Sequence, residues 1–235
     1  MNHQHQRYRT LVWIGLIASL ILLGRQLAGL ALHPTLVPVD DFVEYWAAGR
    51  LNIAGRNPYL GDALLPLQQQ VGWPKVEPLM MWNPPWALTL TTLFSLPGYP
   101  LGRLLWLVTN IAVVFVSADT LWRYYGGAPR QRWISWGLSF TWMPTLVVLA
   151  NGQISPLILL GAVGFLYFLR RRRWEWAGAA AILMSIKPHL LYLFWLALIL
   201  WIISERRWRV ALGCGLALVA LLAMPLICNP AVIFQ

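Results

Sequence analysis

The chain has 235 residues, of which 59% are hydrophobic and only 11% are charged, whereas about 25% of the residues of an average soluble domain are charged. This composition excludes a soluble globular protein, and the apolar residues come in runs close to the ~20 residues that a helix needs to cross a bilayer. The 18 Lys and Arg against 8 Asp and Glu give a net charge of +10, but these charges lie between the apolar runs. They therefore indicate membrane topology, and nucleic acid is not an expected partner.

Seven apolar segments are predicted to cross the membrane as helices, which makes the chain an all-α integral membrane protein. The first segment is followed by a long external loop, residues 33–102, that holds 10 of the 16 prolines and 5 of the 8 acidic residues. The other six segments lie in residues 103–235, and we expect residues 1–235 to form a single membrane domain. The predicted crossings are Leu11–Leu32, Arg103–Trp122, Trp133–Ala150, Ile154–Leu169, Trp174–Ile186, His189–Ile203 and Trp208–Cys228.

The external loop contains two predicted helical elements. Apolar and aromatic residues recur at helical spacing after Asp41, and Gly55 with Asn57-Pro58 ends the pattern, so an amphipathic helix at the membrane interface is expected. The residues of its expected apolar face are Phe42, Tyr45, Trp46 and Leu51. The second element, Pro84–Leu96, is only about thirteen residues long and too short to span a bilayer comfortably.

The basic residues favour one orientation of the chain. If Pro84–Leu96 does not cross and the N-terminus is cytoplasmic, 12 of the 18 Lys and Arg lie inside, among them the run Arg170–Arg173. The positive-inside rule favours this arrangement; the alternative is a reversed N-terminus with a true crossing, which only Arg7 and Arg9 oppose.

In the favoured orientation, polar residues from three separate parts of the chain face the outside. They are the aspartates of the external loop, the turn Asn151-Gly152-Gln153 and the helix break Lys187-Pro188-His189. Polar residues at helix breaks are costly in lipid and are tolerated where they line a protein cavity. Their collection on one side therefore indicates a site.

Asp41 is the first candidate residue, since a carboxylate just beyond a membrane helix can act as a general base. Its spacing to Glu44 is also that of a capped helix start, so Asp41 or Asp40 can simply cap the helix. The two roles are compatible, because a capping aspartate at a membrane surface can still face a cavity.

Lys187 is the second candidate, because it follows a run of only thirteen apolar residues, about 20 Å of helix, and is expected to lie below the outer headgroups. A cation there suits an anionic phosphate, although a lysine that snorkels from a helix end explains it equally well. His189 can hydrogen-bond the same phosphate or an acceptor hydroxyl. The amides of Asn151 and Gln153 can hold sugar hydroxyls, with a turn or cap role as the alternative.

Three stretches carry a resemblance to a known family. DDFVEYWAAGRLNIAGRNPYL, WNPPWALTLTTLFSLP and the pair NGQIS and SIKPHLLYL together resemble bacterial membrane glycosyltransferases that use polyprenyl-phosphate sugars. The closest match is glycosyltransferase family 87, the polyprenyl-phosphate-mannose-dependent mannosyltransferases with the GT-C fold. The resemblance runs from about Leu11 to Leu200, and the stretch that begins at Asp41 is its most specific part.

The resemblance implies a catalytic aspartate in the first external loop, which maps onto Asp41, with Asp40 as the neighbour that can replace it. Tyr45 and Arg56 of the same stretch become substrate-binding candidates. It also implies juxtamembrane helices in that loop and a seven-helix GT-C module, the number of crossings counted above. Members of the family are commonly longer, so a truncated or minimal member that lacks the C-terminal helices of its relatives is expected.

The sequence therefore predicts an inverting hexosyltransferase, with mannose as the expected sugar, in a bacterial inner membrane with its active site facing outward. The donor is a polyprenyl-phosphate sugar, the acceptor is a lipid or a glycan, and membrane lipids surround the protein. No metal or other cofactor is demanded, since Lys187 can supply the positive charge that a divalent ion would otherwise provide. The alternatives are a transporter or flippase for lipid-linked sugar and a non-catalytic membrane scaffold.

Overall fold

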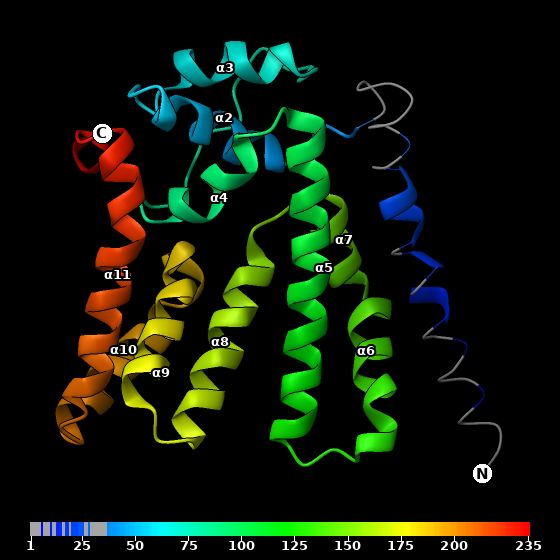
Figure 1. Ribbon diagram of the computed structural model, residues 1–235, viewed down its shortest axis with the longest axis vertical. Coiled ribbons are helices and arrows are strands. Elements are labelled where there is room, and N and C mark those ends of the chain that lie inside the picture. Colours follow the sequence, from blue (N-terminus) through cyan, green and yellow to red (C-terminus); the bar gives the residue numbers. More distant parts are fainter. Residues whose placement is uncertain are drawn as a thin grey trace. The chain divides into compact units, whose positions relative to one another are not determined.

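The computed structural model describes residues 37–235 together with residues 6, 10, 13–15, 17, 18, 20–25 and 28 (Figure 1). All regular secondary structure among these residues is helical, which confirms the all-α prediction. The chain divides into two compact units, one formed by Met1–Phe42 and Gly98–Pro156 and the other by Val43–Pro97 and Leu157–Gln235. A single membrane domain stays a prediction.

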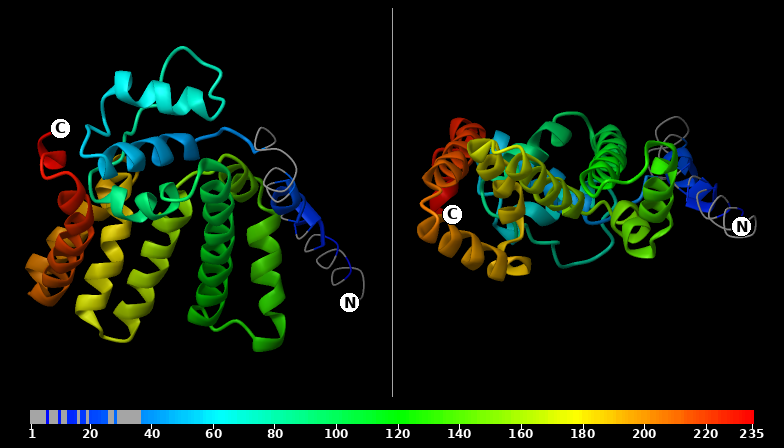
Figure 2. Two further views of the ribbon diagram at one scale, coloured as in Figure 1. Left: turned by 45° about the horizontal axis from the view of Figure 1, so that its top comes forward. Right: turned by 90° about the horizontal axis from the view of Figure 1, so that it is seen from below.

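The first unit is built on α5 (Tyr99–Tyr124), α6 (Arg132–Thr141) and α7 (Met143–Ala150). α5 has a proline in its first turn, where a missing N–H costs nothing, and α6 runs back beside it (Figures 1 and 2). A bend of 61° separates α6 from α7, because the proline at the start of α7 cannot continue the hydrogen-bond ladder of α6. The buried apolar residues of this unit include Leu107, Val114, Phe140 and Leu149.

The second unit contains the remaining helices, with α2 and α8 starting at its boundary with the first. Their bounds are α2 Phe42–Ile53, α3 Gly61–Gln70, α4 Ala87–Ser95, α8 Ser155–Arg170, α9 Trp174–Ile182, α10 Tyr192–Ser204 and α11 Trp208–Cys228. α9 and α11 pack with their backbones in close approach, since a Cβ on Gly178 would collide with the Val210 carbonyl and one on Gly213 with the Glu175 carbonyl. Small residues at a crossing point allow this contact between membrane helices.

Helix α2 forms where the sequence predicts it, but the expected amphipathic character is wrong. Phe42 and Leu51 are buried as expected, yet every position from Val43 to Gly49 is buried too, and Arg50 is the first exposed residue of the helix. Small residues make this possible, because Gly49 lies so close to Ser95 of α4 that a side chain there would have no room. α2 is therefore buried over most of its length, and its position at the membrane interface stays a prediction.

Length and composition support fewer crossings than the seven predicted. In the described part of the chain, α5 with 26 residues and α11 with 21 are long and apolar enough to span a membrane, and the bent pair α6–α7 makes a third span if it is counted as one. α8 has 16 residues and α10 has 13, about 24 and 20 Å, which is shorter than a ~30 Å hydrocarbon core. The first predicted crossing, Leu11–Leu32, falls partly outside the described residues.

The predicted element Pro84–Leu96 is the nine-residue helix α4, about 14 Å long and too short to cross a bilayer. The external loop also contains α3, which the sequence analysis does not anticipate. The predicted crossing Trp174–Ile186 divides into α9 and a 3₁₀ turn, Leu183–Ile186, and the seven-crossing count stays a prediction.

Candidate functional site

Asp40 anchors the start of α2. Its Oδ1 accepts a hydrogen bond from the backbone N–H of Phe42 at 3.1 Å, which is the capping interaction that the sequence analysis assigned to either aspartate. The Phe42 ring packs against Tyr99 and Trp106 of α5, each with a centroid separation of 5.7 Å. The two aspartates are therefore held at a defined place beside the first turns of α5.

A buried ion pair joins Asp40 to Arg103 of α5. The Arg103 Nη2 lies 2.8 Å from Asp40 Oδ2, and its Nε lies 2.9 Å from the same oxygen; the side chains are 1% and 11% exposed. Burial raises the pKa of the Asp40 carboxyl above its ordinary value, while the Arg103 guanidinium and the Phe42 amide act in the opposite direction. Such a paired carboxylate is an anchor, because its oxygens are already engaged.

Arg103 also binds the C-terminal end of α7. Its Nη2 donates to the carbonyls of Leu149 and Ala150 at 3.2 and 3.0 Å. These are carbonyls that a helix end leaves without intrahelical partners, and a cation there is favoured by the helix dipole. One guanidinium thus connects the segment before α2 to the turn that follows α7.

The turn Asn151-Gly152-Gln153 is packed directly against this ion pair. Gly152 has φ +64°, and a Cβ on it would lie 2.7 Å from Asp40 Oδ1 and 3.1 Å from Arg103 Nε. Its carbonyl accepts a hydrogen bond from Trp106 Nε1 at 2.7 Å. Glycine is required here both for the left-handed backbone and for the space.

Asp41 is held by the same turn, but differently from Asp40. Its backbone N–H donates to the Asn151 carbonyl at 3.1 Å, and its Oδ2 accepts a hydrogen bond from Gln153 Nε2 at 2.9 Å across 112 positions of sequence. The Asp41 carboxylate is therefore aimed by a neutral amide, whereas that of Asp40 is neutralised by a guanidinium. Gln153 binds Asp41 through its side-chain amide, and Asn151 binds it through its backbone carbonyl.

The first unit thus brings four of the sequence-predicted site residues together, Asp40, Asp41, Asn151 and Gln153. Sequence reasoning missed Arg103, although a signal was present: an arginine at the start of a predicted membrane crossing needs a partner if it is buried. Its partner is an aspartate 63 positions away, and no local pattern identifies which one.

The remaining candidates belong to the second unit. Lys187 is half-buried between two 3₁₀ turns and His189 is exposed in the second of them, Pro188–Leu190. Tyr45 is buried in α2, and Arg56 is exposed beyond its end. The convergence of Lys187 on Asp41 stays a prediction. Across the described residues, no three His, Cys, Asp or Glu side chains gather in one place.

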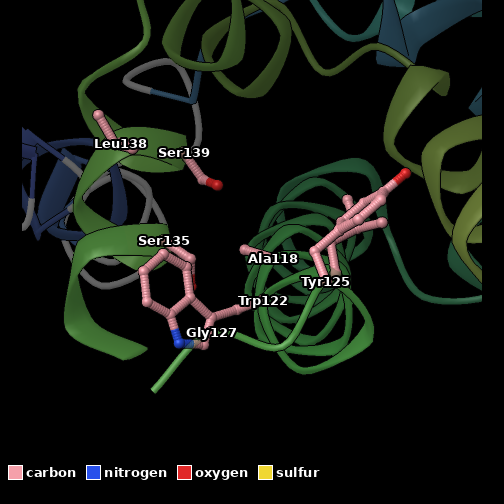
Figure 3. A pocket seen from close by; sticks show the side chains of 8 residues that line it. Ala118, Trp122, Tyr125, Gly127, Ser135, Leu138 and Ser139 are labelled. Atoms are coloured by element: carbon pink, nitrogen blue, oxygen red, sulfur yellow. The ribbon is translucent and has the colours of Figure 1, made fainter. Parts of the chain in front are cut away.

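A separate cavity of about 430 Å³ lies between α5 and α6 at the other end of α5, and Trp122, Tyr125, Ser135 and Ser139 are among the residues that line it (Figure 3). Its lining residues are Ala118, Leu121, Trp122, Tyr125, Gly127, Ser135, Leu138 and Ser139. Helical rise places Ala118 about 22 Å along α5 from Arg103, so this cavity takes no part in the aspartate cluster.

A sequence model of glycosyltransferase family 87 matches residues 82–235, which is more than half of the chain. Neither the curated proteins nor the solved structures contain a match. The matched range begins after the aspartates and includes Arg103, Gly152, Gln153 and Lys187, so the two side chains that bind Asp40 and Asp41 lie inside it.

Proposed function

Because the chain belongs to glycosyltransferase family 87, we propose that this membrane glycosyltransferase moves a hexosyl group from a polyprenyl-phosphate donor to a hydroxyl acceptor. Mannose is the sugar to test first, and the acceptor is a lipid or a glycan. The observation that carries the proposal is the Asp41 carboxylate, fixed at Oδ2 by Gln153 while its neighbour Asp40 is held by Arg103.

Asp41 is the general base of the proposed reaction. As the acceptor oxygen attacks the anomeric carbon, its proton moves to the Asp41 carboxylate, and the bond between the anomeric carbon and the phosphate oxygen breaks. Attack opposite to the leaving group inverts the configuration, and the polyprenyl phosphate departs with the electron pair of the broken bond. Gln153 keeps the base in place, because its amide holds one carboxylate oxygen and leaves the other for the hydroxyl.

Lys187 stabilises the phosphate that leaves with the lipid. Negative charge on the phosphate grows as the glycosidic bond breaks, so a fixed cation lowers the energy of the transition state more than that of the bound donor. His189 follows Lys187 by two positions and assists by hydrogen bonding to the same phosphate or to the acceptor.

The charges on α5 support an outward-facing reaction site in a bacterial inner membrane. Arg103 near the start of α5 is buried and paired with Asp40, whereas Arg123 lies in the last turn of the helix and Arg130 and Arg132 follow that end. The positive-inside rule places the arginine-rich end in the cytoplasm, so the aspartate cluster faces outward. We extend the proposal to a GT-C module of seven crossings, with α2, α3 and α4 as its external juxtamembrane helices.

Asparagine substitutions of the two aspartates test the proposal. Asp41→Asn keeps the side-chain shape and an oxygen that can accept from Gln153, so we expect normal folding and a transfer rate lowered roughly 100-fold or more, the usual size of a general-base contribution. Transfer is measured in proteoliposomes with polyprenyl-phosphate mannose and an acceptor lipid. Asp40→Asn should mainly lower the melting temperature, because it leaves the buried Arg103 charge without its counter-ion.

Asp62→Asn, at an exposed position of α3, is the matched control and should transfer at the parental rate. Loss of transfer in Asp40→Asn with unchanged melting would identify Asp40 as the base. If both site variants transfer sugar at the parental rate, the site assignment is wrong.

A further inference from the structure

Two side chains of the WNPPW segment donate hydrogen bonds to the turn that precedes Lys187. Asn83, which is 4% exposed, donates from Nδ2 to the backbone carbonyl of Ile186 at 3.1 Å. Trp86 donates from Nε1 to the hydroxyl of Ser185 at 2.9 Å. Both bonds cross about a hundred positions of sequence within the second unit, so they tie the external loop to this helix break.

The Ile186 carbonyl needs a donor from outside its own helix. In a continuous α-helix it would accept from the N–H of Leu190, four residues further on. Here the Leu190 N–H donates to the Lys187 carbonyl at 3.1 Å instead. A buried carbonyl without a partner is costly, and the Asn83 amide removes that cost.

The hydrogen bond from Asn83 also helps to set the direction in which the Lys187 side chain projects from the backbone. The Ile186 carbonyl and the N and Cα atoms of Lys187 lie in one peptide plane, so fixing the carbonyl oxygen fixes that plane. The following proline drives Lys187 out of the helical region, to φ −126° and ψ 76°. Between them, the Asn83 bond and Pro188 define where the lysine side chain begins.

The segment that carries Asn83 is itself rigid. Pro84 and Pro85 have fixed φ angles, and Pro84 restricts the backbone of Asn83 as well. The N–H groups of Ala87 and Leu88 donate to the carbonyls of these two prolines at 2.9 and 3.1 Å, which joins the segment to the start of α4. The amide of Asn83 is therefore presented to the helix break from a stiff support.

We propose that Asn83 is a positioning residue for Lys187, with Trp86 holding the preceding turn through Ser185. The inference rests on the proposed function, in which Lys187 stabilises the leaving phosphate. In this proposal the WNPPW segment, residues 82–86, directs the lysine toward the phosphate of a polyprenyl-phosphate donor. Asn83 contacts no reacting atom and acts only through the lysine.

A double-mutant cycle tests the inference in proteoliposomes with polyprenyl-phosphate mannose as the donor. Asn83→Leu should lower kcat/KM for the donor roughly 10- to 100-fold, the effect of a misplacement of about 1 Å. In a Lys187→Ala background the same change should cost less than about 2-fold, because there is no lysine left to misplace. Trp86→Phe removes the Nε1 donor together with the five-membered part of the indole ring, so its cycle with Lys187→Ala separates the effect on the lysine from the loss of packing.

Asn52→Leu is the matched control, since Asn52 is a fully buried amide of the same unit that donates to the Pro225 carbonyl at 3.5 Å. Its effect on kcat/KM should be the same with and without Lys187. The inference is overturned if the effects of Asn83→Leu and Lys187→Ala simply multiply, or if Asn52→Leu shows the same coupling. If Lys187→Ala alone keeps the parental kcat/KM, the phosphate role in the proposed function is wrong and the inference falls with it.

Discussion

Removing the Arg103 guanidinium is the most demanding test of the aspartate cluster. Arg103→Leu places an apolar side chain on α5 and leaves the Asp40 carboxylate, 11% exposed, without the counter-ion that lies 2.8 Å away. It also removes the donor shared by the Leu149 and Ala150 carbonyls. Breaking one side of a buried ion pair typically costs about 3–5 kcal/mol. At 2–4 °C per kcal/mol for a chain of this size, the melting temperature should fall by roughly 6–20 °C.

The loss of stability in Arg103→Leu should depend on pH, and the ionisation of Asp40 determines whether it grows or shrinks. Burial already raises the folded-state pKa of Asp40, and removing Arg103 removes the main opposing effect, so the pKa rises further. A group whose pKa is raised on folding stabilises the folded state most when it is protonated, and it loses that contribution as the pH rises through the folded-state pKa. The deficit of Arg103→Leu should therefore be largest at neutral pH and shrink as the pH falls toward the ordinary Asp value of 3.8.

Thermal melting of the purified protein in detergent between neutral and acidic pH measures both effects. Adding Asp40→Asn to Arg103→Leu should recover part of the lost melting temperature at neutral pH, because the uncompensated charge is gone. The explanation fails if Arg103→Leu melts within about 2 °C of the parent at neutral pH, the range of an ordinary surface change. A deficit that grows on acidification would equally contradict it.

Gly152→Ala should lower stability by about 1–3 kcal/mol for the left-handed backbone and also lower transfer, because its Cβ would press on Asp40. Gly126→Ala, at φ +79° with open space around it, carries the strain alone and should leave transfer unchanged; equal transfer in both variants would contradict the packing argument. For topology, single cysteines at the exposed positions Gln69 and Gln131, in a background without the native cysteines, should react with a membrane-impermeant maleimide only at Gln69. Equal or reversed labelling would overturn the outward-facing site.

Much of the helical framework could be predicted from local signals. Apolar runs locate α5 and α11, because burying apolar side chains in lipid requires long uninterrupted helices. The aspartates before α2 mark where that helix begins, and Pro188 marks the break between α9, with its following 3₁₀ turn, and α10. The α6–α7 bend and helix α3 were missed, since a proline in an apolar run and a short polar helix give weaker signals.

The different roles of Asp40 and Asp41 cannot be read from the sequence and depend on the tertiary structure. The sequence by itself determined that two adjacent carboxylates precede a helix, since charge and capping preference are properties of a short segment. Only the folded chain brings Arg103 to one of them and Gln153 to the other, across 63 and 112 positions. Neighbouring side chains at a helix start point in different directions, so each meets whichever distant element packs on its side. That packing makes Asp40 a buried anchor and leaves Asp41 as the carboxylate aimed by an amide.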